Sequence, residues 1–339
     1  SFALRHTTAA GEWVIGGCEA KVFAWAAVLG GLGEVAAGRF ATAFLLAGIG
    51  TAFHPIVGGW SVIAMVVTWL LGRMRRQAAA EAVSPQRPGS VSWSGAALVA
   101  GGLLAVAVGV VPALGLTAGV DAATRMAATR IYVVDRLSHH LLPRTFADGM
   151  IARHLLAVAV WWLLSVLAPA SVARRRIAVF TLASLAISAA GIGISLLEPW
   201  SSATTFSLLR FYWFRLADVA VPFALATTLA AVLEDRDACS RVAMGRPGWL
   251  RAAAIGLLAL DLAVQVSHWP IAGRKEVVAR ADAKLVAAAW ADACTWVRDH
   301  APADACFLTP RGAASFTWRT GRREVVSWKN SPQDAASLV

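Results

Sequence analysis

The stretch from Arg136 to Pro143 (RLSHHLLP) groups an arginine and two histidines that could bind an anion. If the stretch is helical, residues three and four positions apart share a face, so Arg136, His139 and His140 point the same way. Pro143 would end that helix, because proline lacks the backbone N–H and its ring clashes with the preceding turn. Such a cationic face at a membrane surface suits a lipid phosphate. The alternative is a solvated helix at headgroup level that only touches lipid.

A carboxylate and an amine, Glu19 and Lys21, follow two glycines just before the first apolar stretch. Glu19 could act as a general base or bind a sugar hydroxyl, and Lys21 could neutralise a phosphate. An interfacial charge pair explains the same two residues equally well. His54 stands beside Pro55 in an irregular segment, which is tolerated at membrane depth only inside protein or beside a water-filled cavity. Capping of a helix is the alternative role for His54.

A third group of polar residues lies around the aromatic run that begins after Arg210. Tyr212 belongs to this run, which is typical of the aromatic belt at a membrane interface. Arg215 and Asp218 are three residues apart on a helix and can pair. Asp218 and Asp261 would each lie roughly 10 Å deep, where an unpaired charge costs at least about 2.5–3.5 kcal/mol. We therefore expect Arg215, Asp218 and Asp261 to face the bundle interior, with structural pairing as their role.

Metal and cysteine patterns are weak. Adjacent His139 and His140 differ by about 100° on a helix and lack a third ligand at useful spacing, so no metal site is expected. The four cysteines show no CxxC pattern, although Cys294 and Cys306 could form a disulfide on an oxidising side. GxGxxG, Walker A and GxSxG motifs are absent from the sequence. No cofactor is therefore indicated with certainty, and a divalent metal stays open.

The elements that must position these residues are membrane helices. Apolar residues make up 58% of the chain, charged residues 15%, and the mean hydropathy is +0.62, which is typical of polytopic membrane proteins. The net charge of +11 is therefore not taken as a nucleic-acid signal, and no nucleic-acid partner is expected. A span needs about 20 apolar residues. The predicted spans are about 22–38, 40–54, 56–72, 95–117, 154–170, 177–197, 211–233 and 249–267.

The basic residues orient these spans. With residues 1–21 outside, the inward loops include the arginine-rich segments 73–76 and 174–176, as the positive-inside rule requires. All the polar clusters above then fall on the extracytoplasmic side, as an active site at a membrane face would need. Polar residues must lie outside the bilayer in any case, so simple exposure to solvent also explains why these clusters share one side.

The chain is predicted to hold two domains. Residues 1–269 form the all-α transmembrane domain, whose outer loop 118–153 contains an amphipathic helix. Residues 270–339 form a small extracytoplasmic α/β or α+β domain, truncated at its end. It comprises a surface helix at about 276–300 and short strands at 305–310, 315–318 and 324–328. The chain starts at Ser1 and lacks a clear stop, so we expect a piece of a longer protein.

Several runs of sequence resemble an uncharacterised family of bacterial polytopic membrane proteins. These runs are GGCEAK, HPIVGGW, RLSHHLLP, LLRFYWFRLAD and WVRDHAPADACFLTPR, and the resemblance covers most of residues 12–334. That family is similar to the C-type glycosyltransferases, which transfer sugars from polyprenyl-phosphate donors. The resemblance implies a bacterial cytoplasmic membrane location and lipid partners. Superfamily members usually carry an essential acidic residue in a first outer loop that would precede Ser1; Glu19 is the nearest acid here and is not equated with it.

The leading hypothesis is a membrane-embedded, lipid-phosphate-dependent glycosyltransferase or a non-catalytic relative. Glu19 would bind or deprotonate the acceptor. The residues expected to bind the donor or its phosphate are Lys21, His54, Arg136, His139, His140, Arg210, Tyr212 and Arg215. A transporter or flippase would use the same cavity without breaking bonds, and a membrane scaffold for surface assembly is a third possibility.

Overall fold

The computed structural model describes residues 8–12, 14, 19–81, 93–234, 286–310, 315–325 and 333–339. The chain divides into two compact units. The first comprises Ser1–Leu258 together with Asp334–Val339, and the second comprises Ala259–Gln333. The described residues are mostly helical and include one two-stranded sheet.

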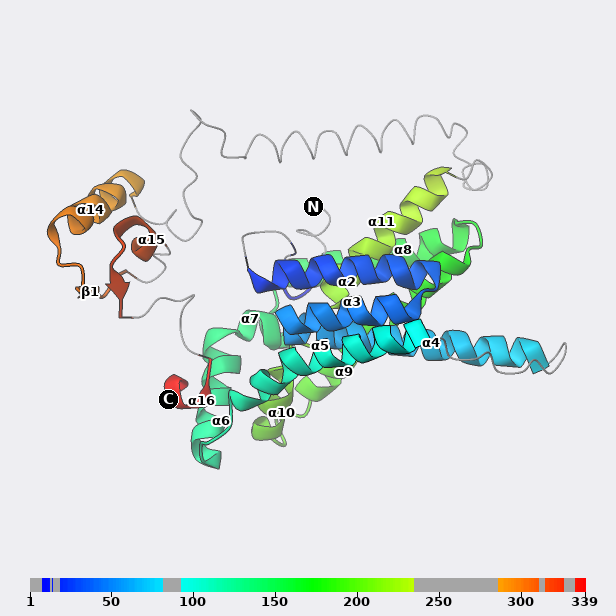
Figure 1. Cartoon of the computed structure of the whole chain (residues 1–339), viewed down its shortest axis with the longest axis horizontal. Coiled ribbons are helices and arrows are strands. Elements are labelled where there is room, and N and C mark those ends of the chain that lie inside the picture. Colours follow the sequence, from blue (N-terminus) through cyan, green and yellow to red (C-terminus); the bar gives the residue numbers. More distant parts are fainter. Residues whose placement is uncertain are drawn as a thin grey trace. The chain divides into compact units, whose positions relative to one another are not determined.

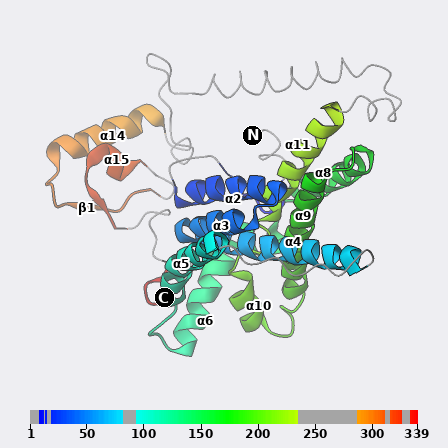
Figure 2. The ribbon, with the colours of Figure 1, turned by 45° about the vertical axis from the view of Figure 1, so that its right-hand side comes forward.

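The first unit is a bundle of apolar helices (Figures 1 and 2). Their bounds are Ala20–Ala37 (α2), Phe40–Phe53 (α3), Pro55–Glu81 (α4), Trp93–Gly115 (α5), Asp148–Leu167 (α8), Val172–Ser195 (α9) and Ala217–Glu234 (α11). α3 packs against α2, α4 and α5, while α11 packs against α8 and α9. Six of these helices, all except α3, are long and apolar enough to cross a membrane, which indicates a multi-pass membrane protein.

These helices lie close to the predicted spans. The last of them starts later than predicted, at Ala217, because residues 211–216 form turns. The predicted span 249–267 and Asp261 within it lie outside the described residues. The mostly helical fold is therefore confirmed, and six of the helices fit membrane spans by length and composition. The predicted number of eight spans is not confirmed, since α3 has only 14 residues.

The junction of α3 and α4 lies at the predicted break. Pro55 opens α4, a position where the missing N–H removes no helical hydrogen bond. His54 has extended backbone angles, as the residue before a proline favours. The chain therefore reverses sharply here, and the His54 side chain is held at the end of the bundle.

Glycines allow the backbones of α3 and α5 to come into direct contact. A Cβ atom on Gly48 would collide with the backbone of Gly102, and one on Gly109 would collide with the carbonyl of Thr51. A Cβ atom on Gly102 would also lie 2.6 Å from the ring of Phe44. Close contact through small residues is typical of helices packed in a membrane, where apolar side chains gain nothing by leaving lipid.

Large apolar side chains stay exposed on the outer faces of α5 and α8. Leu104 and Val111 on α5 are 69% and 65% exposed, and Leu156 and Trp162 on α8 are 63% and 66% exposed. Soluble monomers rarely expose continuous apolar surfaces of this kind. These faces are suited to contact with lipid tails.

Short helices connect α5 to α8 and α9 to α11. They are Ala122–Arg130 (α6), the π-helix Ile131–Arg136 (η1), Ser138–Leu141 (α7), the 3-10 turn Pro143–Thr145 (η2) and Ser202–Leu209 (α10). The prediction of one helix through Arg136 and His140 is wrong, because the backbone breaks at Leu137. The Leu137 N–H donates to the carbonyl of Tyr132, five residues back, and closes a π turn there. α7 does end just before Pro143, as predicted.

The second unit contains Ala287–His300 (α14), Cys306–Phe307 (β1), Phe316–Thr320 (α15) and Arg323–Glu324 (β2). β1 and β2 pair in parallel, with Cys306 opposite Arg323. The predicted helix and two of the three predicted strands are present, although both strands are short.

The predicted strand at 315–318 is wrong, because this segment forms α15. Helical backbone lets Phe316 pack against Trp290 and Phe307, with ring centroids 6.1 and 5.3 Å away. The suggested disulfide is not formed, since Cys294 is a buried free thiol and Cys306 an exposed one. The chain then ends in Ala335–Leu338 (α16), which packs on α6 of the first unit.

Candidate functional site

Asp218, fully buried at the start of α11, binds the N-terminal segment of the chain. Its Oδ1 accepts the Ala9 N–H at 2.6 Å, and its Oδ2 accepts the N–H groups of Ala10 and Glu12 at 3.1 Å each. Converging backbone N–H groups form an anion-binding nest. Gly11, with φ of +72°, supplies the turn that aims them. Asp218 was predicted to pair with Arg215, but its carboxylate accepts hydrogen bonds from these backbone N–H groups instead.

Glu12 is the anion that Arg215 and Lys21 share. Its Oε2 lies 2.6 Å from the Arg215 Nε, and its Oε1 lies 3.4 Å from the Lys21 Nζ. All three side chains are about nine-tenths buried or more. Buried ions persist only when their partners are close, because each of them loses its hydration. Glu12 therefore fixes both cations at the end of the bundle.

Arg215 also contacts the His54 ring. The Arg215 Nη1 lies 3.3 Å from the His54 Nε2. A guanidinium group can only donate, so the His54 nitrogen accepts and the ring is neutral. Burial, and then the charge of Arg215, lower the pKa of His54 to about 4. His54 is thus a hydrogen-bond acceptor at neutral pH.

Tyr212 adopts a strained backbone beneath Arg215. Its φ of +52° lies in the left-handed region, which costs a bulky residue about 1–3 kcal/mol. The Arg215 guanidinium lies 3.9 Å from the Tyr212 ring centroid, and the hydroxyl groups of Tyr212 and Tyr132 are 3.2 Å apart. Burial raises the pKa of Tyr212, so its hydroxyl stays protonated. Strain of this kind is common at functional sites, where surrounding contacts maintain it.

His140 connects α7 to the same N-terminal segment. Its Nδ1 lies 2.5 Å from the carbonyl oxygen of Ala10, and because a carbonyl only accepts, that nitrogen carries the proton. Burial lowers the pKa of His140 and favours the neutral ring. The exposed ring of His139 lies 4.1 Å away, between centroids. The Arg210 Cζ atom lies 5.9 Å from the centroid of the Tyr132 ring, and this contact joins Arg210 to the same network.

Six of the residues predicted to bind substrate therefore belong to one connected network. They are Lys21, His54, His140, Arg210, Tyr212 and Arg215. Half-buried Glu19 occupies the N-cap position of α2 without a side-chain capping bond, and half-buried Arg136 ends η1. Within the described ranges, no three His, Cys, Asp or Glu side chains gather as a metal site.

Sequence reasoning missed Glu12 and His154. His154 lies on α8 with its Nδ1 3.9 Å from the Asp218 Oδ1. Glu12 had a usable signal, since two cations expected at the bundle end require an anion and few acids precede α2. His154 had none, because its place on the inner face of α8 depends on contacts far along the chain.

A bundle of apolar helices with a buried ionic network at one end is typical of multi-pass membrane proteins. A family model described as Domain of unknown function (DUF6798) matches residues 288–339, from the second residue of α14 through α16. Comparisons with curated proteins and with solved structures found no match. The likeness to C-type glycosyltransferases has no support from these comparisons.

Proposed function

We propose that this membrane protein handles a polyprenyl-phosphate-linked sugar at the Glu12–Arg215 end of its bundle, on the extracytoplasmic face. One observation supports the proposal. Cations, neutral histidines and tyrosine hydroxyls from separate parts of the chain meet in one network at the ends of apolar helices, where lipid phosphates lie. Guanidinium groups suit phosphate because they offer two parallel donors.

In the proposed transfer, an acceptor hydroxyl oxygen attacks C1 of the sugar while the bond from C1 to the phosphate oxygen breaks. The polyprenyl phosphate leaves with the bonding electron pair, and the acceptor proton passes to a carboxylate. Arg136 and Arg210 would stabilise the leaving phosphate. Glu12 is a positioning residue, because its oxygens already bind Lys21 and Arg215. Glu19 remains the candidate base, at the start of α2.

Translocation of a lipid-linked sugar is the second candidate function. It is favoured by the interruption at Pro55 between α3 and α4, and by the prolines Pro112 inside α5 and Pro222 inside α11. Interrupted helices are typical of transporter sites. Release of free polyprenyl phosphate in sealed vesicles distinguishes transfer from translocation, since translocation leaves the donor intact.

We expect the loss of single phosphate-binding side chains to weaken binding of a polyprenyl-phosphate analogue to the full-length protein in vesicles. His139→Ala should weaken it about 10- to 150-fold, the worth of one hydrogen bond to a charged group, whereas the neutral His140 ring already donates its single N–H to the Ala10 carbonyl. Arg136→Lys should also weaken it, because the planar donor fork is lost while the charge remains. Arg125→Lys is the matched control on exposed α6. Equal affinities in all four proteins would contradict the proposal.

The proposed orientation places the start of α9 in the cytoplasm and α6 outside. In a variant whose four cysteines are serine, Ser171→Cys should react with an impermeant thiol reagent only after intact cells are permeabilised. Ala123→Cys should react in intact cells. Both positions are exposed, so reactivity reports the side of the membrane. Labelling of position 171 from outside would invert the orientation and exclude an extracytoplasmic site.

A further inference from the structure

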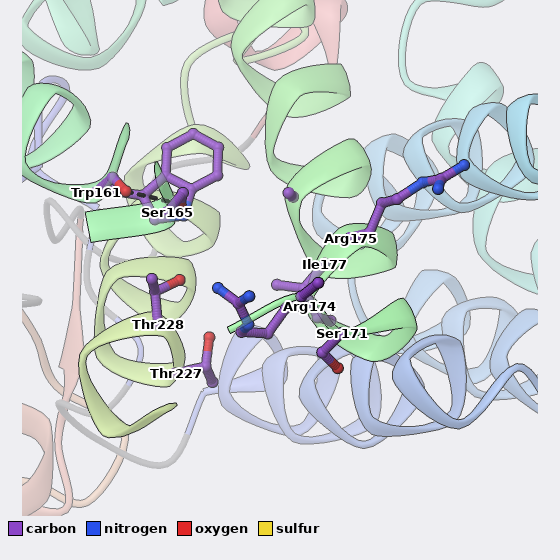
Figure 3. Close-up of a pocket in the computed structure, with 10 residues that line it drawn as sticks. Trp161, Ser165, Ser171, Arg174, Arg175, Ile177, Thr227 and Thr228 are labelled. Atoms are coloured by element: carbon purple, nitrogen blue, oxygen red, sulfur yellow. Dashed lines mark hydrogen bonds between the residues drawn. The ribbon is translucent and has the colours of Figure 1, made fainter. Parts of the chain in front are cut away.

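A separate cavity with both polar and apolar walls lies between α8, α9 and α11 (Figure 3). Its volume is about 210 Å³, and its walls include Arg174, Ser171, Thr227 and Thr228. Thr228 lies ten residues beyond Asp218 on α11, about 15 Å along the helix. The cavity is therefore distinct from the Glu12–Arg215 network, and its role does not depend on the function proposed for that network.

The Arg174 side chain extends from α9 toward α11 and Thr228 (Figure 3). Its Nε is buried and has no hydrogen-bond partner in the part of the chain that the structure describes. No aspartate or glutamate is among the described residues that line the cavity. A counter-charge beside a guanidinium group that is partly withdrawn from water offsets the cost of its desolvation.

The neighbouring arginines differ from Arg174 in their contacts. Arg176 donates to the carbonyl of Ala36 at 2.8 Å and lies over the Phe40 ring. Arg175 also lines the cavity, but the residue is exposed and its guanidinium points away from Thr227 and Thr228 (Figure 3). Arg174 is thus the member of this arginine run that is aimed into the cavity.

Thr228 adds an available donor. Its side chain lines the cavity, the residue is only 5% exposed, and its hydroxyl makes no hydrogen bond within the described ranges. Thr227 differs, because its hydroxyl donates to the carbonyls of Phe223 and Ala224 at 3.0 and 3.1 Å. The first turn of α9 adds backbone N–H groups, which have no partners inside the helix. The arrangement therefore offers a cation and donors that an anion can use.

We propose that this cavity binds the phosphoryl group of an anionic ligand, with Arg174 as the cation and Thr228 as a hydrogen-bond donor. The phosphoryl group belongs either to a lipid headgroup or to a free phosphate. Basic pockets between membrane helices bind anionic headgroups through the same chemistry. The surrounding lipid-facing helices would leave room for attached acyl chains beside the cavity.

The test uses full-length protein extracted from vesicles of phosphatidylcholine with phosphatidylglycerol, and retained lipid is counted by native mass spectrometry. Wild type should retain phosphatidylglycerol selectively, and Arg174→Gln should reduce its occupancy at least tenfold. Arg175→Gln, which removes the same charge one residue away, should leave it unchanged. Thr228→Val should reduce it several-fold, whereas Thr227→Val should not, because the Thr227 hydroxyl is already satisfied.

Inorganic phosphate distinguishes the two sources. If phosphate protects wild type but not Arg174→Gln against heat, with no selective lipid retention, the ligand is a free phosphate. If lipid retention alone depends on Arg174, the ligand is a headgroup, and either result supports the site. The proposal is overturned if Arg174→Gln and Arg175→Gln have equal effects in both assays. It is also overturned if folded Thr228→Val matches wild type in both.

Discussion

Glu12→Gln should destabilise the bundle by about 3–5 kcal/mol, the loss expected when a buried ion pair is left with one unpaired charge. Glutamine keeps the size of the side chain and an oxygen acceptor, so the effect reports on charge and not on packing. Without the carboxylate, buried Lys21 and Arg215 face each other with no anion between them. The free energy of unfolding, measured by denaturant titration of the protein in detergent, checks the expectation.

The pair of Glu34 and Arg39 provides the control. Its atoms approach as closely, but Arg39 is 64% exposed, so Glu34→Gln should cost far less than Glu12→Gln. Adding Lys21→Met to Glu12→Gln should restore part of the lost stability, since one unpaired cation is removed. Equal losses for the two glutamine variants, with no recovery in the double variant, would mean that Glu12 does not compensate the buried cations.

Asp218→Ala should release the N-terminal segment from the bundle. Three backbone N–H groups lose their acceptor, and a buried unpaired donor costs about 1–3 kcal/mol, so the total loss is expected to be about 3–5 kcal/mol. The stability of Asp218→Asn should lie between those of wild type and Asp218→Ala, because the amide keeps only one accepting oxygen. Hydrogen exchange at Ala9, Ala10 and Glu12 should accelerate in the same order.

The N-cap residue Asp121 of α6 provides a control that distinguishes release of the N-terminal segment from destabilisation of the whole bundle. Asp121 accepts the Thr124 N–H at the exposed start of α6, so Asp121→Asn should leave exchange at residues 9–12 unchanged. If Asp218→Ala leaves the exchange of Ala9, Ala10 and Glu12 unchanged, Asp218 does not hold the segment. The role of Glu12 would then need another anchor, since Asp218 positions its backbone.

Local features of the sequence predicted most of the fold. The apolar stretches, the break at Pro55 and the stop before Pro143 depend on neighbouring residues, and the structure contains all three. The strand predicted at 315–318 was wrong. Its alternating pattern fits a strand, but Phe316 makes its contacts with Trp290 and Phe307 from a helix. The prediction of one helix through Leu137 was also wrong, because the spacing of residues in the sequence does not indicate a π turn.

The candidate site was predictable in part. Lys21 and His54 were identified from local signals, the two glycines before the first span and the break at Pro55, and Arg215 from the cost of a charge inside a span. Their partners were not, since Glu12 lies about 200 residues from Arg215 along the chain and Asp218 binds backbone groups that carry no residue signature. Spacing along one helix suggested Arg215 as the partner of Asp218, but three converging N–H groups satisfy that carboxylate instead.

The position of a bound polyprenyl phosphate tests the central claim most directly. An analogue with a photoreactive group beside its phosphate is irradiated with the full-length protein in vesicles, and the adducts are mapped by mass spectrometry. The proposed function predicts adducts within residues 131–145 and 207–216 that excess unlabelled lipid displaces. They should disappear when Arg136, His139 and His140 are all alanine. Adducts spread over the lipid-facing surfaces of α5 and α8, and unchanged in that triple variant, would contradict it.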